Sequence, residues 1–158
     1  MNKKWLTLII VLMLALLLNV LYNNYIKIDE SIEILEIIKS NIVDKEYINI
    51  DKVVTEEWDR LLIVGPYTER KEAEKESGIR LNQIKNYNMN FNDGANLLVF
   101  CSDRKVSMYV YLARSIADID LLTLKKDSQD RIVLLPRNQT KFKVVKENDK
   151  YRLEKYNN

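Results

Sequence analysis

Hydrophobic and polar positions divide the chain into an apolar N-terminal stretch and a longer mixed part. Residues 5–26 contain no charged side chain and are mostly leucine, isoleucine and valine. These 22 residues form, at about 1.5 Å each, a helix about 33 Å long, enough to cross a hydrocarbon core of about 30 Å. We therefore predict an N-terminal transmembrane helix, followed by a folded domain.

The flanks of this span predict its orientation. Lys3 and Lys4 precede it, and cationic residues stay preferentially on the cytoplasmic side of a membrane. Trp5 at one end, with Tyr22 and Tyr25 at the other, suits the two bilayer interfaces. A cleaved signal peptide is the alternative, but no small-residue cleavage pattern follows the apolar run. A single-pass integral membrane protein with a cytoplasmic N-terminus is the favoured interpretation.

The 158 residues suit one domain, and 47% hydrophobic with 30% charged residues is a foldable mixture. The expected organisation is a cytoplasmic stub at residues 1–4, an anchor at 5–26 and a single extracytoplasmic domain at 27–158.

After the anchor, residues 29–42 have the period of an amphipathic helix. The expected apolar stripe consists of Ile32, Leu35, Ile38 and Ile42, at spacings of three or four residues. Asp29 is the expected N-cap. Such a helix packs on the sheet of its own domain, or alternatively residues 28–42 form a short dimerising stalk.

The clearest signals for the start and end of secondary-structure elements lie between Trp58 and Gly78. An apolar run after Trp58 predicts a strand that stops at Gly65-Pro66, because proline cannot continue a central ladder. One further short helix is expected at residues 69–77, with Thr68 as its N-cap and Gly78 as its stop. Tyr67 has two interpretations: it covers the core edge, or it contributes to a binding pocket.

The rest of the chain predicts strands. Residues 86–92 alternate asparagine with Tyr87, Met89 and Phe91, the period of a half-buried strand, and Asp93-Gly94 predicts a hairpin turn after it. Further strands are expected at 97–102, 106–112, 132–136, 142–145 and 151–156. Short consecutive strands joined by tight turns indicate a mainly antiparallel meander sheet, and the fold class is α+β.

Two stretches carry a resemblance to known proteins. The sequence W-D-R-L-L-I-V-G-P-Y-T-E-R-K-E from Trp58, together with N-D-G-A-N-L-L-V-F from Asn92, resembles a group of small, membrane-anchored or secreted bacterial proteins of unknown function. The resemblance covers roughly residues 50–112. It implies export and a compact α+β domain, and it implies no activity or catalytic residue.

Charge disfavours nucleic acid as a partner. From residue 26 onward the chain has 23 basic and 23 acidic side chains, without the cationic surplus that releases counterions from phosphates. The balance is uneven, since residues 26–59 carry 4 basic and 10 acidic side chains and residues 60–158 carry 19 and 13. These opposite charges attract each other within the fold, or they form a charged docking surface.

The residue types limit the chemistry. The sequence has no histidine and only one cysteine, Cys101, which disfavours ordinary zinc sites and histidine-assisted nucleophilic catalysis. Cys101 lies in an apolar strand and is expected to be a buried thiol. The only dense acidic cluster is Glu56, Glu57 and Asp59. We predict no catalytic residue, no cofactor and no bound metal.

These observations favour a membrane-tethered extracytoplasmic interaction module that binds a protein partner or a component of the cell envelope. The candidate partner-binding residues are Trp58, Asp59 and Tyr67. Two alternatives stay open: a structural subunit of a membrane complex that assembles through its anchor and residues 28–42, and a carboxylate-dependent enzyme that acts on the cell wall.

Overall fold

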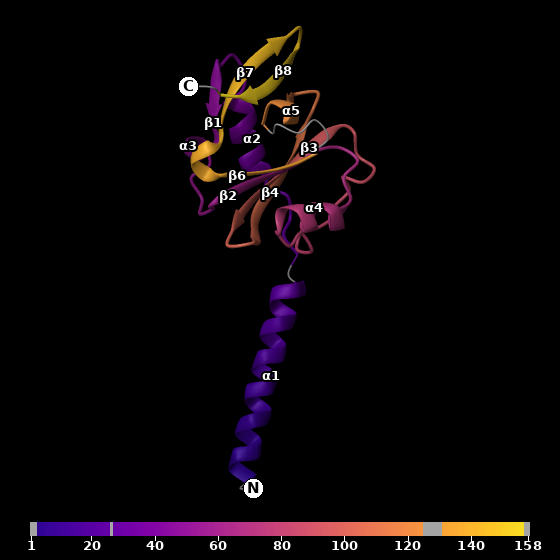
Figure 1. The fold of residues 1–158 in the computed structure, drawn as a ribbon. Coiled ribbons are helices and arrows are strands. Elements are labelled where there is room, and N and C mark those ends of the chain that lie inside the picture. The colour runs from indigo at the N-terminus through magenta and orange to yellow at the C-terminus, as the bar shows by residue number, and fades with distance from the viewer. Residues whose placement is uncertain (1–2, 26, 125–130, 157–158) are drawn as a thin grey trace.

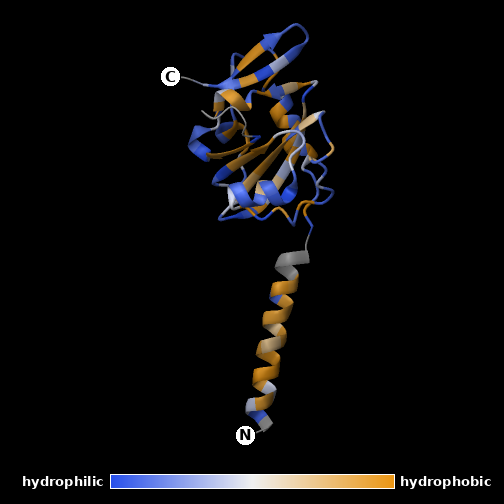
Figure 2. Cartoon of the chain, turned by 45° about the vertical axis from the view of Figure 1, so that its right-hand side comes forward, coloured by the Kyte–Doolittle hydropathy of each residue, from blue (hydrophilic) through white to orange (hydrophobic). Residues whose placement is uncertain are grey.

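The computed structural model of the protein describes residues 3–25, 27–124 and 131–156. Helix α1 (Lys3–Tyr25) projects from a mixed α+β domain (Figure 1). None of its 18-residue stretch Lys4–Leu21 is buried, and Figure 2 shows that most of the helix between its N-terminal turn and the grey last turn is apolar. The predicted helix is thus long and apolar enough to cross a membrane, a property that signal sequences share.

Helix α2 (Ile32–Ser40) begins three residues later than the sequence predicts. Its N-cap is Ser31, whose hydroxyl accepts a hydrogen bond from the Ile34 N–H (3.4 Å), so the prediction that Asp29 caps it is wrong. Asp29 instead forms an ion pair with Lys85 (2.8 Å).

The buried face of α2 differs in part from the predicted stripe. Ile34, Ile38 and, just beyond the helix, Ile42 are buried, whereas Ile32 is 61% exposed. The predicted stripe is therefore right for Ile38 and Ile42, partly right for Leu35, which is partly buried against the core, and wrong for Ile32. Packing against strand β4 selects this face, and the buried side chains join the core of the domain.

One sheet has the order β4-β3-β2-β6, and all of its neighbours are antiparallel. Its strands are β2 (Arg60–Val64), β3 (Ala95–Ser102), β4 (Lys105–Ala113) and β6 (Ile132–Pro136). Leu61 to Val64 are all buried, because core residues cover both faces of the sheet. One face packs on α2 and the second sheet, and the other packs on α4 (Arg70–Ser77) and residues 79–89.

The second sheet has the order β1-β7-β8-β5. Its strands are β1 (Tyr47–Asn49), β7 (Lys141–Glu147), β8 (Lys150–Lys155) and β5 (Ala117–Ile119), and β5 runs parallel to β8. Short helices α3 (Ile50–Val53), α5 (Leu121–Leu124) and η1 (Arg137–Gln139) complete the fold. The strands therefore form two sheets rather than the single meander that the sequence predicts, since β6 pairs with β2 while β7 and β8 join β1.

The predicted strand at residues 86–92 is wrong. This segment consists of turns, with Met89 buried and Phe91 84% exposed. Asparagine side chains support turns by bonding nearby backbone groups, as when Asn92 Oδ1 accepts from the Gly94 N–H (2.9 Å). No hairpin precedes β3, which begins at Ala95 directly after this loop.

The predicted helix after the Gly-Pro-Tyr corner is confirmed as α4, but its predicted cap is wrong. Thr68 is buried, and its hydroxyl donates to the Gly65 carbonyl (2.8 Å) rather than capping the helix, whose N-cap position is Glu69. Gly78 ends the helix in the left-handed conformation (φ 70°), as expected. Gly65 is closely packed: a Cβ there would lie 2.7 Å from Leu121 Cδ1 and 3.3 Å from the Arg131 carbonyl oxygen, so a larger residue would require the Leu121 side chain to shift.

Candidate functional site

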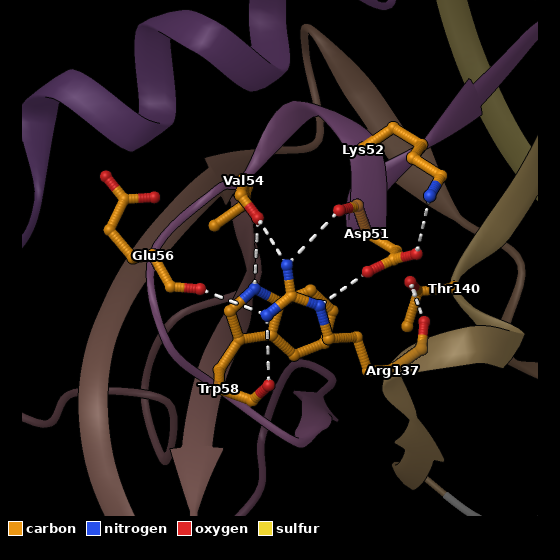
Figure 3. Close-up of polar contacts among 7 residues, drawn as sticks. All are labelled: Asp51, Lys52, Val54, Glu56, Trp58, Arg137 and Thr140. Carbon is orange, nitrogen blue, oxygen red and sulfur yellow. Dashed lines mark hydrogen bonds and ion pairs between the residues drawn. The ribbon is translucent and has the colours of Figure 1, made fainter.

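Trp58 lies in the core two residues before β2, with only 5% of its surface exposed. Its ring meets Phe100 edge to face, with the ring centroids 5.2 Å apart. Its indole N–H donates to the Val54 carbonyl (3.2 Å), and the Arg137 guanidinium lies over the ring, 4.6 Å from its centroid (Figure 3). Every part of the side chain therefore has a partner within the domain.

Arg137 closes the loop that precedes Trp58. Its Nε donates to Asp51 Oδ1 (2.5 Å), and its Nη1 donates to the carbonyls of Glu56 (3.0 Å) and Trp58 (3.2 Å). Its Nη2 donates to the carbonyls of Asp51 (3.3 Å) and Val54 (3.2 Å) (Figure 3). One side chain thus satisfies four backbone carbonyls and one carboxylate, which fixes residues 51–58 against β6 and η1.

The hydrogen bond from Arg137 holds the pKa of Asp51 below its usual value, against the opposing effect of burial. Lys52 adds a smaller effect in the same direction, at 3.6 Å from the carboxylate. No sequence signal marks Arg137, which follows Pro136 as a lone cation and lies more than 80 positions from the acid that it pairs with.

The structure does not bring the predicted site residues to one surface. Trp58 is inside the domain, Asp59 lies at the start of β2, and Tyr67 lies beyond its other end. The five residues of β2 alone span about 17 Å at about 3.4 Å per residue. Asp59 Oδ2 accepts from the Asp103 N–H (3.3 Å), which ties it to the β3–β4 turn.

Tyr67 does not cover the core edge. It has a left-handed backbone (φ 57°), and its side chain is 53% exposed. Arg131 lies over the ring at 5.9 Å and donates to the Pro66 and Tyr67 carbonyls (both 3.3 Å).

Cys101 is fully buried in β3, as the sequence predicts. Burial raises the pKa of its thiol to about 12, and the nearby Asp59 carboxylate acts in the same direction. The reactive thiolate is therefore scarce at neutral pH. Among the described residues, no group of three or more Cys, Asp or Glu is arranged to hold a metal ion.

A second polar cluster joins β3 to β5. Arg114 binds both carboxylate oxygens of Asp118, at 2.8 and 2.6 Å, and Asn96 donates to the same carboxylate (3.0 Å). Burial raises the pKa of Asp118, but the bonds from Arg114 and Asn96 together lower it further, so its net shift is downward. These contacts order the turn after β4.

The structure reveals an exposed aromatic group that sequence reasoning missed. Tyr47 on β1 and Tyr156 after β8 meet edge to face, with their ring centroids 5.9 Å apart. The Lys141 ammonium lies 4.3 Å from the centroid of Tyr47 and 3.6 Å from that of Tyr156. We call these three residues the tyrosine–lysine surface. Their positions are far apart in the sequence, and only the pairing of β1, β7 and β8 brings them together.

Three open hollows surround the tyrosine–lysine surface. One, of about 620 Å³, lies beside β1 and includes Tyr47 and Lys52. A second, of about 720 Å³, is lined by Tyr47 and Tyr156 with Lys45, Lys143 and Lys155, and a third, of about 440 Å³, by Tyr156 and Lys141. Within the part of the chain that the structure describes, Lys45, Lys143 and Lys155 have no carboxylate within ion-pair distance.

No protein-family model matches this sequence, and no curated protein and no solved structure matches it either.

Proposed function

We propose that the protein is a membrane-tethered interaction module, anchored by α1, whose domain lies outside the cytoplasm and binds a protein partner or a component of the cell envelope. The observation that carries this proposal is α1, an apolar helix of membrane-spanning length with no buried residue between Lys4 and Leu21. An apolar surface of this size is stable only when it is covered, and lipid covers it best.

The tyrosine–lysine surface is the best candidate for the binding face. Tyrosine contributes a large rigid contact area at low entropic cost and is enriched among residues that dominate binding. Tyr47 is 50% exposed, and β1, β7 and β8 lie at the end of the domain opposite α1 (Figure 1). The hollow between the two tyrosines is lined by three lysines, Lys45, Lys143 and Lys155, against two carboxylates, Glu46 and Glu154, a small cationic excess that suits a partner with negative charge.

The structural-subunit alternative loses part of its support. A stalk at residues 28–42 would present a heptad seam of Ile28, Ile32, Leu35 and Ile42. Of these, Ile42 is buried in the domain's own core, Ile28 and Leu35 are partly buried against it, and Ile32 alone is exposed. Self-assembly would therefore depend on α1.

Site-specific photo-crosslinking of the full-length protein in intact cells tests the proposed binding face. A photoreactive phenylalanine analogue at Tyr47 should give one dominant adduct, and the same analogue at the exposed Leu122 should not. Adducts with a second copy of the chain from positions in α1 alone would favour the structural subunit. An adduct from Tyr67 but not Tyr47 would place binding at the corner after β2 and contradict the assignment to the tyrosine–lysine surface.

A further inference from the structure

Three chain segments form the end of the domain next to α1. Residues 27–31 follow the helix, and Ile28 pairs with Ile84, donating its N–H to the Gln83 carbonyl (2.8 Å) and accepting from the Lys85 N–H (3.1 Å). At the other end of that loop, Arg80 forms a bridge with Lys105 and donates its N–H to the Arg104 carbonyl (3.3 Å). The β3–β4 turn therefore lies beside residues 80–85, at the end of the domain from which α1 projects (Figure 1).

Residues 27–31 are built into the domain rather than serving as a loose linker. The Ser31 N–H donates to the Tyr109 carbonyl (3.0 Å), and the Glu30 carboxylate accepts from the Tyr111 N–H (2.8 Å), so both bond the free edge of β4. One residue separates Tyr25 from Lys27, and consecutive Cα atoms are about 3.8 Å apart, so the Lys27 Cα lies within about 8 Å of the end of α1. The distance between this end of the domain and a membrane that holds α1 is therefore short.

This end carries exposed cations that lack carboxylate partners. Lys27, Arg80, Arg104 and Lys105 are exposed, and we call these four residues the basic end. In the described ranges, none of the four has a carboxylate within ion-pair distance. Lys27 Nζ donates to the Asn82 carbonyl (2.5 Å).

The carboxylates nearby are mostly engaged. Asp29 pairs with Lys85 (2.8 Å), Asp59 accepts from the backbone of the β3–β4 turn, and Glu74 accepts from the Leu81 N–H (2.7 Å). Hydrogen bonds from backbone N–H groups leave these carboxylates charged, but Glu74 and Glu30 are only partly exposed. Among the described residues that are exposed at this end, five are basic (Lys27, Arg80, Lys85, Arg104 and Lys105) and three are acidic (Asp29, Asp59 and Asp103), so the exposed surface has a cationic excess of two.

We propose that the basic end binds anionic phospholipid headgroups of the leaflet at which α1 emerges, and so holds the domain against the membrane with the tyrosine–lysine surface facing away. This inference rests on the proposed membrane tether. Each lysine or arginine near an anionic surface strengthens binding by about fivefold, an effect that falls off over about 10 Å at 0.1 M salt.

Amine labelling of the full-length protein in lipid nanodiscs tests this docking. Discs of phosphatidylcholine alone are compared with discs in which a third of the lipid is phosphatidylglycerol, and acetylation of each lysine is followed by mass spectrometry. We expect Lys105 to react at least about threefold more slowly in the anionic discs, because docking excludes the reagent. Lys150, exposed in the β7–β8 turn, should react equally in both discs.

A charge-removal pair makes the test specific. Arg80→Gln with Arg104→Gln should abolish the protection of Lys105, since two cations contribute roughly 25-fold together. The matched control, Lys146→Gln with Lys150→Gln, should keep it. Equal labelling of Lys105 in the two kinds of disc, in protein that co-purifies with the discs, would overturn the docking alone, whereas failure to enter the discs would overturn the tether as well.

Discussion

Replacing Trp58 with alanine should lower the free energy of unfolding by about 3 to 5 kcal/mol, a large share of the roughly 5 to 15 kcal/mol of a typical domain. The variant leaves a cavity beside Phe100 and removes the indole bond to the Val54 carbonyl and the stacking surface of Arg137. Thermal unfolding of the full-length protein in mild detergent, followed by far-ultraviolet circular dichroism, measures the change.

The matched control is Tyr67→Ala, which removes an aromatic side chain that is 53% exposed. Its effect should stay within about 1 kcal/mol, because surface substitutions rarely cost more. A Trp58→Ala protein that unfolds at the wild-type temperature but loses its crosslinked partner would mean that Trp58 is a binding residue and not a core residue.

Replacing Arg137 with alanine should lower the free energy of unfolding by about 2 to 4 kcal/mol, because four carbonyls and one carboxylate each lose a hydrogen bond. Of these four carbonyls, within the described part of the chain, only that of Val54 keeps another hydrogen bond, from the Trp58 indole. Because the Arg137–Asp51 pair is partly exposed, this loss of stability is smaller than for a fully buried ion pair. Arg137→Lys keeps the positive charge but not the planar guanidinium with its several N–H donors. It should therefore recover less than about 1 kcal/mol of the lost stability. Urea unfolding of the three proteins in the same detergent gives the comparison.

Arg152→Ala is the control for the loss of a surface arginine. Arg152 on β8 pairs with Glu147 (2.8 Å) and Glu154 (2.7 Å) at the surface, and its removal should leave the stability close to that of the wild type. Equal losses from Arg137→Ala and Arg152→Ala would contradict the role given to Arg137.

The pH dependence gives a second measure of the Arg137–Asp51 pair. The folded pKa of Asp51 is lowered, so its contribution is present above the unfolded pKa of about 3.9 and disappears as the pH falls through the folded value. The stability difference between wild type and Arg137→Ala should therefore be constant above about pH 5 and should shrink as the pH falls below about 4.

Local pattern predicted most of the elements. The apolar run of α1, the strands β2 to β4 and β6 to β8, and the Gly78 stop depend on nearby residues, and all are present. The errors are local too: Asn92 and its neighbours stabilise turns, which the alternation of Tyr87, Met89 and Phe91 concealed. Ser31 rather than Asp29 caps α2 because residues 28–31 are already bonded to neighbouring segments.

What the sequence could not predict is the association of distant segments. Tyr47 meets Tyr156 only because β1 pairs with β7 and β7 with β8, and Arg137 meets Trp58 only because β6 pairs with β2. No periodicity specifies such pairings. We predicted the site from residues that are close together in the sequence. In the structure, strand β2 between Trp58 and Tyr67 keeps these residues apart.

The central claim is that α1 anchors the protein with its domain outside the cytoplasm. Labelling intact cells with a membrane-impermeant maleimide tests it directly, because the buried Cys101 leaves the background low. A cysteine introduced by Lys150→Cys should react in intact cells, one introduced by Lys4→Cys should react only after permeabilisation, and both proteins should sediment with membranes at full length. Reaction of Lys4→Cys but not Lys150→Cys in intact cells, or a soluble product that begins between residues 19 and 26, would contradict the account.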